Sequence, residues 1–292
     1  MKHLLNIDDL SAADIEGLYE LTDMLKADPE SFGETLTNES LVMLFAKPST
    51  RTRISFEAGM TELGGHAIHF SKDHSQISRG ESLTDTATVL SRYAGGIMAR
   101  LFEHETLLEL AAGADVPVIN GLTDKLHPCQ ALADGYTLRE KGLDDGPVAY
   151  VGDGNNVAHS LMQLCAALDI PCRIATPEGF EPDDGIRDRV ADADVVVTND
   201  PVEAVSGARA VYTDVFVSMG DDDSKRAAFE GFQVNTELMA ETDDAAFMHC
   251  LPAHRGEEVS AAVMDGEQSI VYDQAENRKH VQKAILHTLY DA

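Results

Sequence analysis

A short segment near residue 50 is rich in hydroxyl and guanidinium side chains. Ser49-Thr50-Arg51-Thr52-Arg53 follows an apolar run and precedes helix-forming residues, which predicts strand, turn and helix with Ser49 as the N-cap. The helix dipole disfavours cations in the first turn by roughly 0.3–1 kcal/mol each, so an anion is expected to offset them. Free amides, hydroxyls and guanidinium groups together favour phosphate. We therefore predict a phosphate site, although a surface turn with ordinary arginines has the same local pattern.

Other reactive polar groups stand after predicted strands. In order, they are Arg100, His127 with Gln130, Asn155 with Asn156, Asp214, and Cys250. Ligands of open α/β sheets bind outside the carboxyl ends of the strands, so these groups are expected to share a site. The set from the first half of the chain is electropositive, whereas the set from the second half suits an amine or an amino acid. The sequence therefore predicts a site for two substrates, a phosphate compound and an amine.

Helical and strand-like stretches alternate along the chain. Strands are expected at 41–45, 66–70, 96–100, 116–120, 148–152, 171–175, 195–198, 211–214 and 247–250, and helices at 12–26, 54–63, 83–93, 105–112, 126–141, 157–168, 186–191 and 274–290. The predicted fold class is α/β, with two doubly wound domains, parallel sheets, and the active site in the cleft between them. The expected domains are 1–130 and 131–273, with a C-terminal helix at about 274–292 packing back on the first.

The charge balance is strongly acidic. The chain has 51 acidic and 22 basic residues and a formal net charge of −29, spread along its length. This argues against nucleic acid or an anionic membrane as a partner. No apolar stretch of about 18 residues and no signal-peptide pattern is present, so we expect a cytoplasmic protein. Dispersed acidity is typical of proteins from salt-loving archaea, where high salt screens self-repulsion, and we hypothesise such a host.

Metal, disulfide and dinucleotide chemistry are not favoured by the spacing of the residues. The cysteines form no Cys-x-x-Cys pair and are expected to be reduced thiols. Asp153-Gly154-Asn155-Asn156 follows a strand but lacks the three glycines of an NAD-binding fingerprint. His249 and Cys250 are adjacent, and their side chains are expected to point to opposite faces of a strand, which argues against a shared metal ion.

Four motifs resemble those of the ornithine branch of the aspartate/ornithine carbamoyltransferase family. They are Ser49-Thr50-Arg51-Thr52-Arg53, His127-Pro128-Cys129-Gln130, Asp214 with Ser218-Met219-Gly220, and His249-Cys250-Leu251-Pro252. They occur in the family's order, and the resemblance extends from Leu41 to Lys279. It implies transfer of the carbamoyl group of carbamoyl phosphate to the δ-amino group of L-ornithine, giving L-citrulline and phosphate, with no metal and no cofactor. Either direction, biosynthetic or degradative, is open.

The resemblance also implies roles for individual residues. Carbamoyl phosphate would be bound by Ser49, Thr50, Arg51, Thr52, Gln76, Arg100, His127, Gln130, Cys250, Leu251 and Arg278. Ornithine would be bound by Asn156, Asp214, Ser218 and Met219. Arg100, His127, Asp214 and Cys250 would take part in catalysis. Asp214 and Cys250 both remain candidates for accepting the proton of the amine.

The family resemblance further implies a homo-oligomer built on trimers. Gln76 lies in a segment that in this family reaches the site of a neighbouring subunit. Two alternatives stay open at this point. One is a carbamoyltransferase for another amine, such as putrescine, and the other is a non-catalytic α/β protein that binds a phosphorylated ligand.

Overall fold

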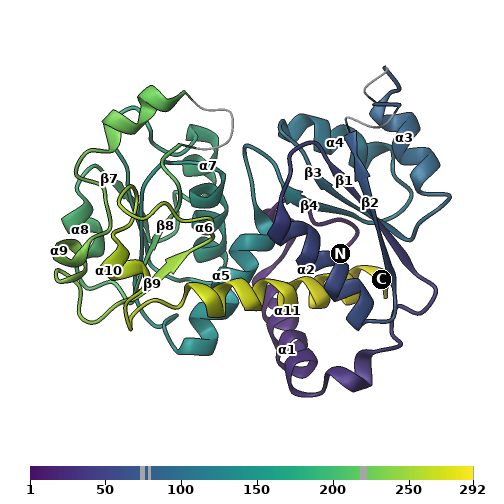
Figure 1. Ribbon diagram of the computed structural model, residues 1–292, viewed down its shortest axis with the longest axis horizontal. Coiled ribbons are helices and arrows are strands. Elements are labelled where there is room, and N and C mark those ends of the chain that lie inside the picture. The colour runs from purple at the N-terminus through teal and green to yellow at the C-terminus, as the bar shows by residue number, and fades with distance from the viewer. Residues whose placement is uncertain (73–75, 78–79, 218–221, 292) are drawn as a thin grey trace. The chain divides into compact units, whose positions relative to one another are not determined.

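The computed structural model describes residues 1–72, 76–77, 80–217 and 222–291 (Figure 1). The chain divides into two compact units. The first comprises Met1–Ala133 with Arg278–Ala292, and the second comprises Asp134–Asn277. Unit 1 is therefore assembled from both ends of the chain, and unit 2 is inserted between them.

Unit 1 contains a four-stranded parallel sheet in the order β2-β1-β3-β4. Its strands are β1 (Ser40–Phe45), β2 (His66–Ser71), β3 (Gly96–Arg100) and β4 (Val118–Leu122), and its own helices include α1 (Ala12–Ala27), α2 (Thr50–Glu62), α3 (Leu83–Leu90) and α4 (His104–Gly113). The apolar residues of β1 are all buried, as expected for a central strand covered on both faces. Leu4 extends the edge by pairing with Ile119 of β4.

Unit 2 contains a five-stranded parallel sheet in the order β7-β6-β5-β8-β9. Its strands are β5 (Val148–Val151), β6 (Cys172–Ala175), β7 (Val195–Thr198), β8 (Ala210–Thr213) and β9 (Ala246–His249), and its helices include α6 (Asn156–Ala167), α7 (Asp184–Arg189), α8 (Pro201–Val205), α9 (Thr236–Met239) and α10 (Ala261–Met264). The core joins sheet residues such as Val211 and Phe247 to Phe216, Phe229 and Phe232 from the connecting segments.

Two helices contribute residues to both units, namely α5 (Pro128–Lys141) and α11 (Val271–Tyr290). The part of α11 in unit 1 is tied to the N-terminal part of the chain. The Lys283 ammonium, which is almost fully buried, lies 2.9 Å from one carboxylate oxygen of Glu62, and Lys279 lies 2.7 Å from the other. A buried ammonium is costly unless it is paired, so Glu62 fixes where α11 can pack.

All nine predicted strands are present, and the predicted α/β class with two parallel sheets is confirmed. Helix α2 begins at Thr50, earlier than the predicted range 54–63, because Ser49 caps it. The short helices α8, α9 and α10 were missed, since four or five residues are too few to show a helical period.

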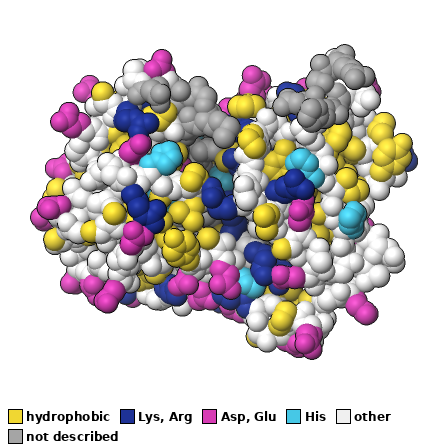
Figure 2. Space-filling view, in the orientation of Figure 1, with side chains coloured by type: hydrophobic (Ala, Val, Ile, Leu, Met, Phe, Trp, Pro, Cys, Tyr) yellow, Lys and Arg dark blue, Asp and Glu magenta, His cyan; other side chains and the backbone are white. Residues whose placement is uncertain are grey.

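The acidic side chains are dispersed over the visible surface and form no single block (Figure 2). This agrees with their even spread along the sequence. Among the described residues, no helix is both long enough and apolar enough to cross a membrane.

Candidate active site

The sheet topology of unit 1 brings the predicted phosphate turn next to Arg100. Strand β1 lies between β2 and β3, so the chain leaves β1 in one direction and later returns to its other side. Phe45, the last residue of β1, is in register with Arg100, and the Ala46 amide donates to the Arg100 carbonyl oxygen at 2.9 Å. This reversal of strand order is where ligands of doubly wound sheets collect.

Ser49 is the N-cap of α2, as predicted. Its Oγ accepts from the Thr52 amide at 3.3 Å and donates to Thr52 Oγ1 at 3.0 Å. The Arg51 guanidinium is half-buried and has no hydrogen-bond or ion-pair partner among the residues that the structure describes, so it is available to an anion. Arg53 differs, because its Nε lies 2.8 Å from Glu57 one turn later. Arg53 therefore already has an anionic partner within α2.

Arg278 connects three helices within unit 1. Its Nη2 donates to Thr52 Oγ1 of α2 at 2.7 Å, and its Nη1 donates to Gln130 Oε1 of α5 at 3.0 Å. All three side chains are buried. Because Thr52 Oγ1 accepts from Ser49 and Arg278, its own hydroxyl hydrogen is left to donate elsewhere. The predicted anion-site residues Ser49, Thr52, Gln130 and Arg278 thus form one hydrogen-bonded group.

His127 and Cys129 lie beside this group, and both are buried. Burial lowers the pKa of His127 well below its usual value, and the charges of Arg278 and Arg100 lower it further, so the imidazole is neutral at pH 7. Burial also raises the pKa of the Cys129 thiol to about 12, a rise that the Arg278 charge partly opposes. Cys129 therefore stays a thiol and donates to the Asn120 carbonyl oxygen at 3.4 Å.

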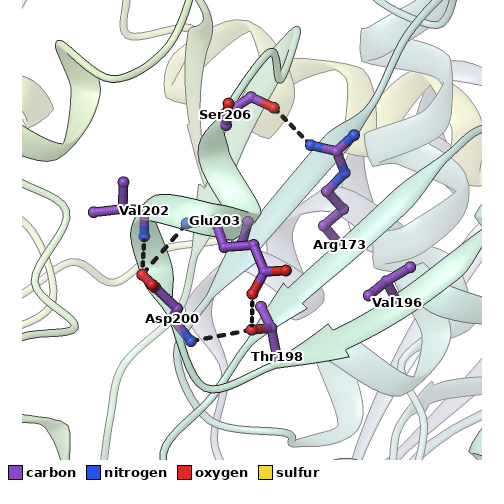
Figure 3. A pocket seen from close by; sticks show the side chains of 8 residues that line it. Arg173, Val196, Thr198, Asp200, Val202, Glu203 and Ser206 are labelled. Atoms are coloured by element: carbon purple, nitrogen blue, oxygen red, sulfur yellow. Dashed lines mark hydrogen bonds between the residues drawn. The ribbon is translucent and has the colours of Figure 1, made fainter.

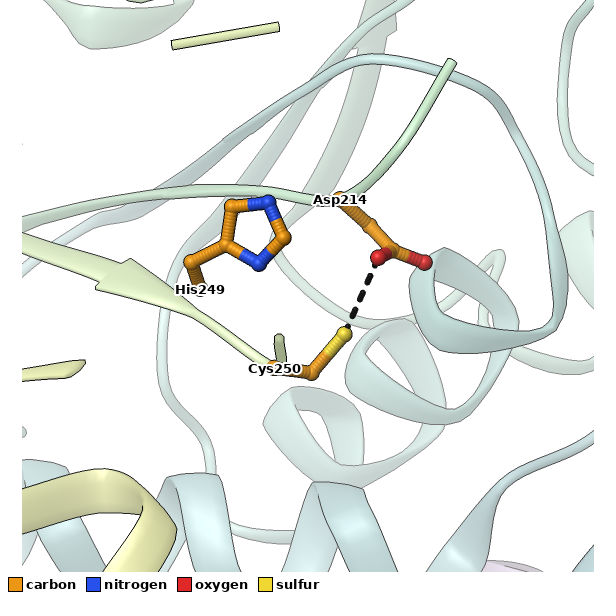
Figure 4. A group of neighbouring side chains, drawn as sticks. All are labelled: Asp214, His249 and Cys250. Atoms are coloured by element: carbon orange, nitrogen blue, oxygen red, sulfur yellow. Dashed lines mark hydrogen bonds between the residues drawn. The ribbon is translucent and has the colours of Figure 1, made fainter. Parts of the chain in front are cut away.

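In unit 2 the strand order reverses between β5 and β8, and Asp214 directly follows β8. The carboxylate is buried and, from the residues that the structure describes, accepts a hydrogen bond on each oxygen. The Cys250 thiol donates to Oδ1 at 3.0 Å, and the Asn155 amide donates to Oδ2 at 3.3 Å. Figure 4 shows the thiol pointing at the carboxylate. Predicted site residues from two strand ends, Asp214 and Cys250, are thus in direct contact.

The two ring nitrogens of His249 interact with Leu251 and with Glu258. Its Nδ1 accepts from the Leu251 amide at 2.9 Å, so the neutral ring carries its hydrogen on Nε2, which faces the Glu258 carboxylate at 3.1 Å. Burial raises the pKa of the Glu258 carboxyl, but hydrogen bonds from His249 and from the His254 amide outweigh it and the net pKa is lowered. Leu251 has a φ of 59°, an uncommon conformation for leucine, and the hydrogen bond from its amide to His249 Nδ1 helps to hold that conformation.

The prediction that the His249 and Cys250 side chains point to opposite faces of a strand is wrong. Cys250 follows the last residue of β9, and donor atoms of Asp214, His249 and Cys250 lie within 4.8 Å of one another. Such a cluster could bind a metal ion. However, both ring nitrogens of His249 are already engaged, by Leu251 and by Glu258, so the ring has no lone pair to offer.

Two lysines, Lys47 near the Ser49 turn and Lys225 beside Asp153, were not singled out from the sequence. Lys47 is buried, forms an ion pair with Asp124 and lies 4.4 Å from the centre of the Phe102 ring. Lys225 Nζ lies 2.6 Å from Asp153 Oδ2. Lys47 adjoins the Ser49 turn in sequence, which was an available signal, whereas Lys225 is far from Asp153 along the chain and no sequence pattern connects them.

The remaining predicted site residues are less informative. Gln76 is exposed, and its carbonyl oxygen accepts from the Glu81 amide at 3.2 Å. Asn156 is half-buried as the first residue of α6, and Thr50 begins α2. Ser218 and Met219 lie outside the described residues.

A separate pocket of about 550 Å³ lies at the edge of the unit 2 sheet (Figure 3). Its polar lining groups bind one another. Thr198 Oγ1 donates to Glu203 at 2.6 Å, Asp200 caps α8, and Arg173 Nη1 donates to the Ser206 carbonyl oxygen at 2.6 Å. None of the predicted site residues lines this pocket, and its polar groups are explained by the local fold.

Comparison with known proteins matches both halves of the chain. Residues 2–140 match the family described as aspartate/ornithine carbamoyltransferase, carbamoyl-P binding domain, and residues 144–289 match the Asp/Orn binding domain of the same family. The chain is 62% identical over 293 residues to a protein of Halobacterium salinarum named "Ornithine carbamoyltransferase, catabolic", covering 99% of each chain.

Solved structures agree with this match. The structure titled as ornithine carbamoyltransferase from Pyrococcus furiosus has a TM-score of 0.94 and 45% identity, covering 100% of this chain and 97% of that one. The anabolic ornithine carbamoyltransferase from Campylobacter jejuni has a TM-score of 0.93 and 36% identity, covering 100% and 99%. The chain belongs to the aspartate/ornithine carbamoyltransferase family.

Proposed function

We propose that the protein transfers the carbamoyl group of carbamoyl phosphate to the δ-amino group of L-ornithine, giving L-citrulline and phosphate. One observation carries the choice of amine. Asp214, a buried carboxylate held on both oxygens by neutral donors, stands at the strand ends of unit 2. A buried carboxylate of this kind attracts a cationic amine and repels a second carboxylate such as that of aspartate.

Carbamoyl phosphate is bound by the anion site of unit 1. The free amides of α2, the Ser49 and Thr50 hydroxyls and the half-buried Arg51 guanidinium bind the phosphate, and Arg278 adds positive charge through Thr52. Arg100, His127 and Gln130 hold the carbamoyl group. A phosphate bound this way leaves readily, because its charge is already neutralised.

Ornithine must lose a proton before it attacks. An unperturbed alkyl ammonium has a pKa of about 10.4, which leaves roughly one molecule in a thousand neutral near pH 7.4. Desolvation lowers that pKa, and Asp214, with Cys250 beside it, orients the amine and receives the proton directly or through a relay. Asn156, Ser218 and Met219 bind the amino acid end of ornithine in this proposal.

Negative charge then develops on the carbonyl oxygen of the carbamoyl group. Arg100, the Thr52 hydroxyl and neutral His127 are the donors proposed to stabilise it. A neutral imidazole can donate one hydrogen bond without carrying a competing positive charge into a site that already holds two guanidinium groups. Holding the two reactants together accounts for a further part of the rate, about 7–11 kcal/mol in favourable cases.

A product assay tests the function. Purified protein in high salt is incubated with carbamoyl phosphate and with ornithine, putrescine or aspartate, and the ureido product is measured. We expect product with ornithine and at least about a hundredfold less with the other two amines. Putrescine lacks the amino acid end and loses its contacts, and aspartate brings a second carboxylate towards Asp214. Product only with putrescine supports the alternative amine, and no product with any amine supports a non-catalytic binding protein.

We further propose the degradative direction and a trimer-based assembly. The direction rests on the name of the Halobacterium relative, and saturation curves for phosphate plus citrulline against carbamoyl phosphate plus ornithine test it. The assembly rests on exposed Gln76 reaching a neighbouring subunit. Mixing Gln76→Ala and Asp214→Asn chains tests this: activity above that of either variant alone supports shared sites, and no gain argues against them.

A further inference from the structure

The turn that carries Asn155 requires glycine at the preceding position, Gly154. A Cβ at Gly154 would lie 2.4 Å from the Pro182 nitrogen and 2.5 Å from the Phe180 carbonyl oxygen, so a side chain there would displace the backbone. The Gly154 amide donates to that same carbonyl oxygen at 2.9 Å. Close approach of these two segments places Asn155 as the N-cap of α6, in the turn that follows β5.

The amide of Asn155 has one orientation. Its Oδ1 accepts from the Val157 amide at 2.9 Å, the Ala158 amide at 3.3 Å and the Tyr150 hydroxyl at 3.4 Å. Turning the amide over would place its NH₂ group against these donors and its oxygen against a carboxylate. The capping bonds therefore fix the NH₂ group towards Asp214 Oδ2, 3.3 Å away.

Tyr150 supports this orientation. Burial raises the pKa of its phenol well above the usual value, and the negative charges of Asp214 and Asp153 raise it further, so the hydroxyl keeps its hydrogen and remains a donor to Asn155. Asn155 thus has donors on one side and an acceptor on the other, which an asparagine satisfies with two separate groups, whereas an ionised aspartate has no donor and a serine has only one, shorter hydroxyl.

We propose that Asn155 is a positioning residue that holds Asp214 in the orientation that receives the amine substrate. The helix cap fixes the Asn155 amide, the amide fixes Oδ2, and the Cys250 thiol fixes Oδ1. Both oxygens of Asp214 then keep defined directions for their remaining lone pairs. This inference rests on the proposed function for its meaning in catalysis, but the coupling between the cap and the carboxylate can be measured without activity.

Titratable and charged groups from several elements surround Asp214. Among the described residues, these groups include Cys250 and His249 from the end of β9, Tyr150 and Asp153 from the end of β5, and Tyr212 from β8. Asp134 of α5 acts on Tyr212, and Lys225 pairs with Asp153. Since the Lys225 ammonium offsets the negative charge of Asp153, a new carboxylate at position 155 would interact mainly with Asp214 and Cys250.

Two substitutions separate positioning from capping. Asp and Ser are both good N-caps, so Asn155→Asp and Asn155→Ser each keep α6 capped. Asn155→Ser loses the donor to Asp214 without adding charge. Asn155→Asp places a carboxylate against Asp214, so that the pair retains a proton and one pKa is raised above the unfolded value of about 3.9.

The first readout is thermal stability between pH 5 and pH 8. A carboxyl whose folded pKa is raised loses its stabilisation as the pH rises through that pKa. We therefore expect the melting temperature of Asn155→Asp to fall further below that of the wild type as the pH increases, whereas the Asn155→Ser difference stays constant. If the role is capping alone, Asn155→Asp should be as stable as the wild type at pH 8, which would overturn the proposal.

The second readout is steady-state kinetics at saturating carbamoyl phosphate. We expect kcat/KM for ornithine to fall about tenfold in Asn155→Ser and at least about a hundredfold in Asn155→Asp, with KM for carbamoyl phosphate within about twofold of the wild type. A wild-type value for ornithine in Asn155→Asp contradicts the inference alone. A wild type that forms no citrulline contradicts the proposed function, and the pH-dependent stability of Asn155→Asp still decides the inference.

Discussion

The two units are similar in fold but differ in charge. Unit 1 has 21 acidic and 13 basic residues, a net charge of −8, whereas unit 2 has 30 acidic and 9 basic residues, a net charge of −21. The unit with more basic residues carries the guanidinium groups proposed for carbamoyl phosphate, and the strongly acidic unit carries the carboxylate proposed for the amine. The negative background of unit 2 thus favours a cationic amine, and the weaker negative background of unit 1 opposes an anion less than that of unit 2 would.

The same contrast holds for individual contacts. In unit 1 a charged donor, Arg278, is held by the neutral acceptors Thr52 and Gln130. In unit 2 a charged acceptor, Asp214, is held by the neutral donors Asn155 and Cys250. Neutral partners of this kind orient a charge without cancelling it.

The largest expected effect is the loss of Arg51. Arg51→Gly removes a guanidinium that has no partner in the described part of the chain, and we expect kcat/KM to fall at least about 10³-fold, since the phosphate loses a charged donor. Arg53→Gly is the matched control, because it carries the same helix cost of about 1 kcal/mol but removes only the partner of Glu57. Equal losses in both variants, measured by citrulline formation, would mean that Arg51 is not special.

Asp214→Asn should have the next largest effect, confined to the amine. We expect kcat/KM for ornithine to fall about 10²-fold while KM for carbamoyl phosphate stays within about twofold, because the lost charge belongs to unit 2. The exposed Asp145→Asn, in the same unit, serves as a control. A large rise in KM for carbamoyl phosphate would show that the division of labour between the units is wrong.

Salt should stabilise the protein, and unit 2 more than unit 1. Between 0.1 M and 3 M KCl we expect the melting temperature to rise by about 5 °C, which corresponds to roughly 2 kcal/mol, because screening relieves self-repulsion. Hydrogen exchange compared at the two salt concentrations should show a greater gain in protection in β5–β9 than in β1–β4. A flat melting temperature would end the halophile hypothesis, and equal gains would remove the contrast between the units.

His127 should contribute the smallest effect, seen in acid. Its folded pKa is lowered by burial and by the nearby arginines, so in mild acid the imidazole is protonated in the unfolded chain but stays neutral in the folded chain. Stability is therefore intact above pH 6.5 and falls by about 1.4 kcal/mol for each pH unit below it. Denaturant melts of the wild type and His127→Gln at pH 7.5 and 5.5 should show a weaker pH dependence in the variant. An identical dependence would indicate that His127 is not held neutral.

The sequence predicted most of the fold, because buried parallel strands and amphipathic helices have clear periods. It also predicted the Ser49 cap and the set of polar strand ends, since the carboxyl ends of parallel strands share one edge. The pairing of Arg53 with Glu57 was missed even though the two lie four residues apart, a spacing that the helical pattern already contained.

Other features depended on contacts that no local pattern encodes. Lys225 meets Asp153, and Arg278 meets Thr52, across long stretches of chain. The convergence of His249, Cys250 and Asp214 depended on where β9 ends, and strand ends are the least certain part of any sequence-based assignment. The orientation of Asn155 required the three-dimensional positions of its donors.

The position of Arg278 in α11 has a consequence for how the enzyme is made. During synthesis the ribosome produces the phosphate turn early and the whole of unit 2 next, and only afterwards the helix that brings a guanidinium to Thr52 and two ammonium groups to Glu62. A nascent chain therefore lacks the contact between Arg278 and Thr52 until α11 has been synthesised and has packed on α2.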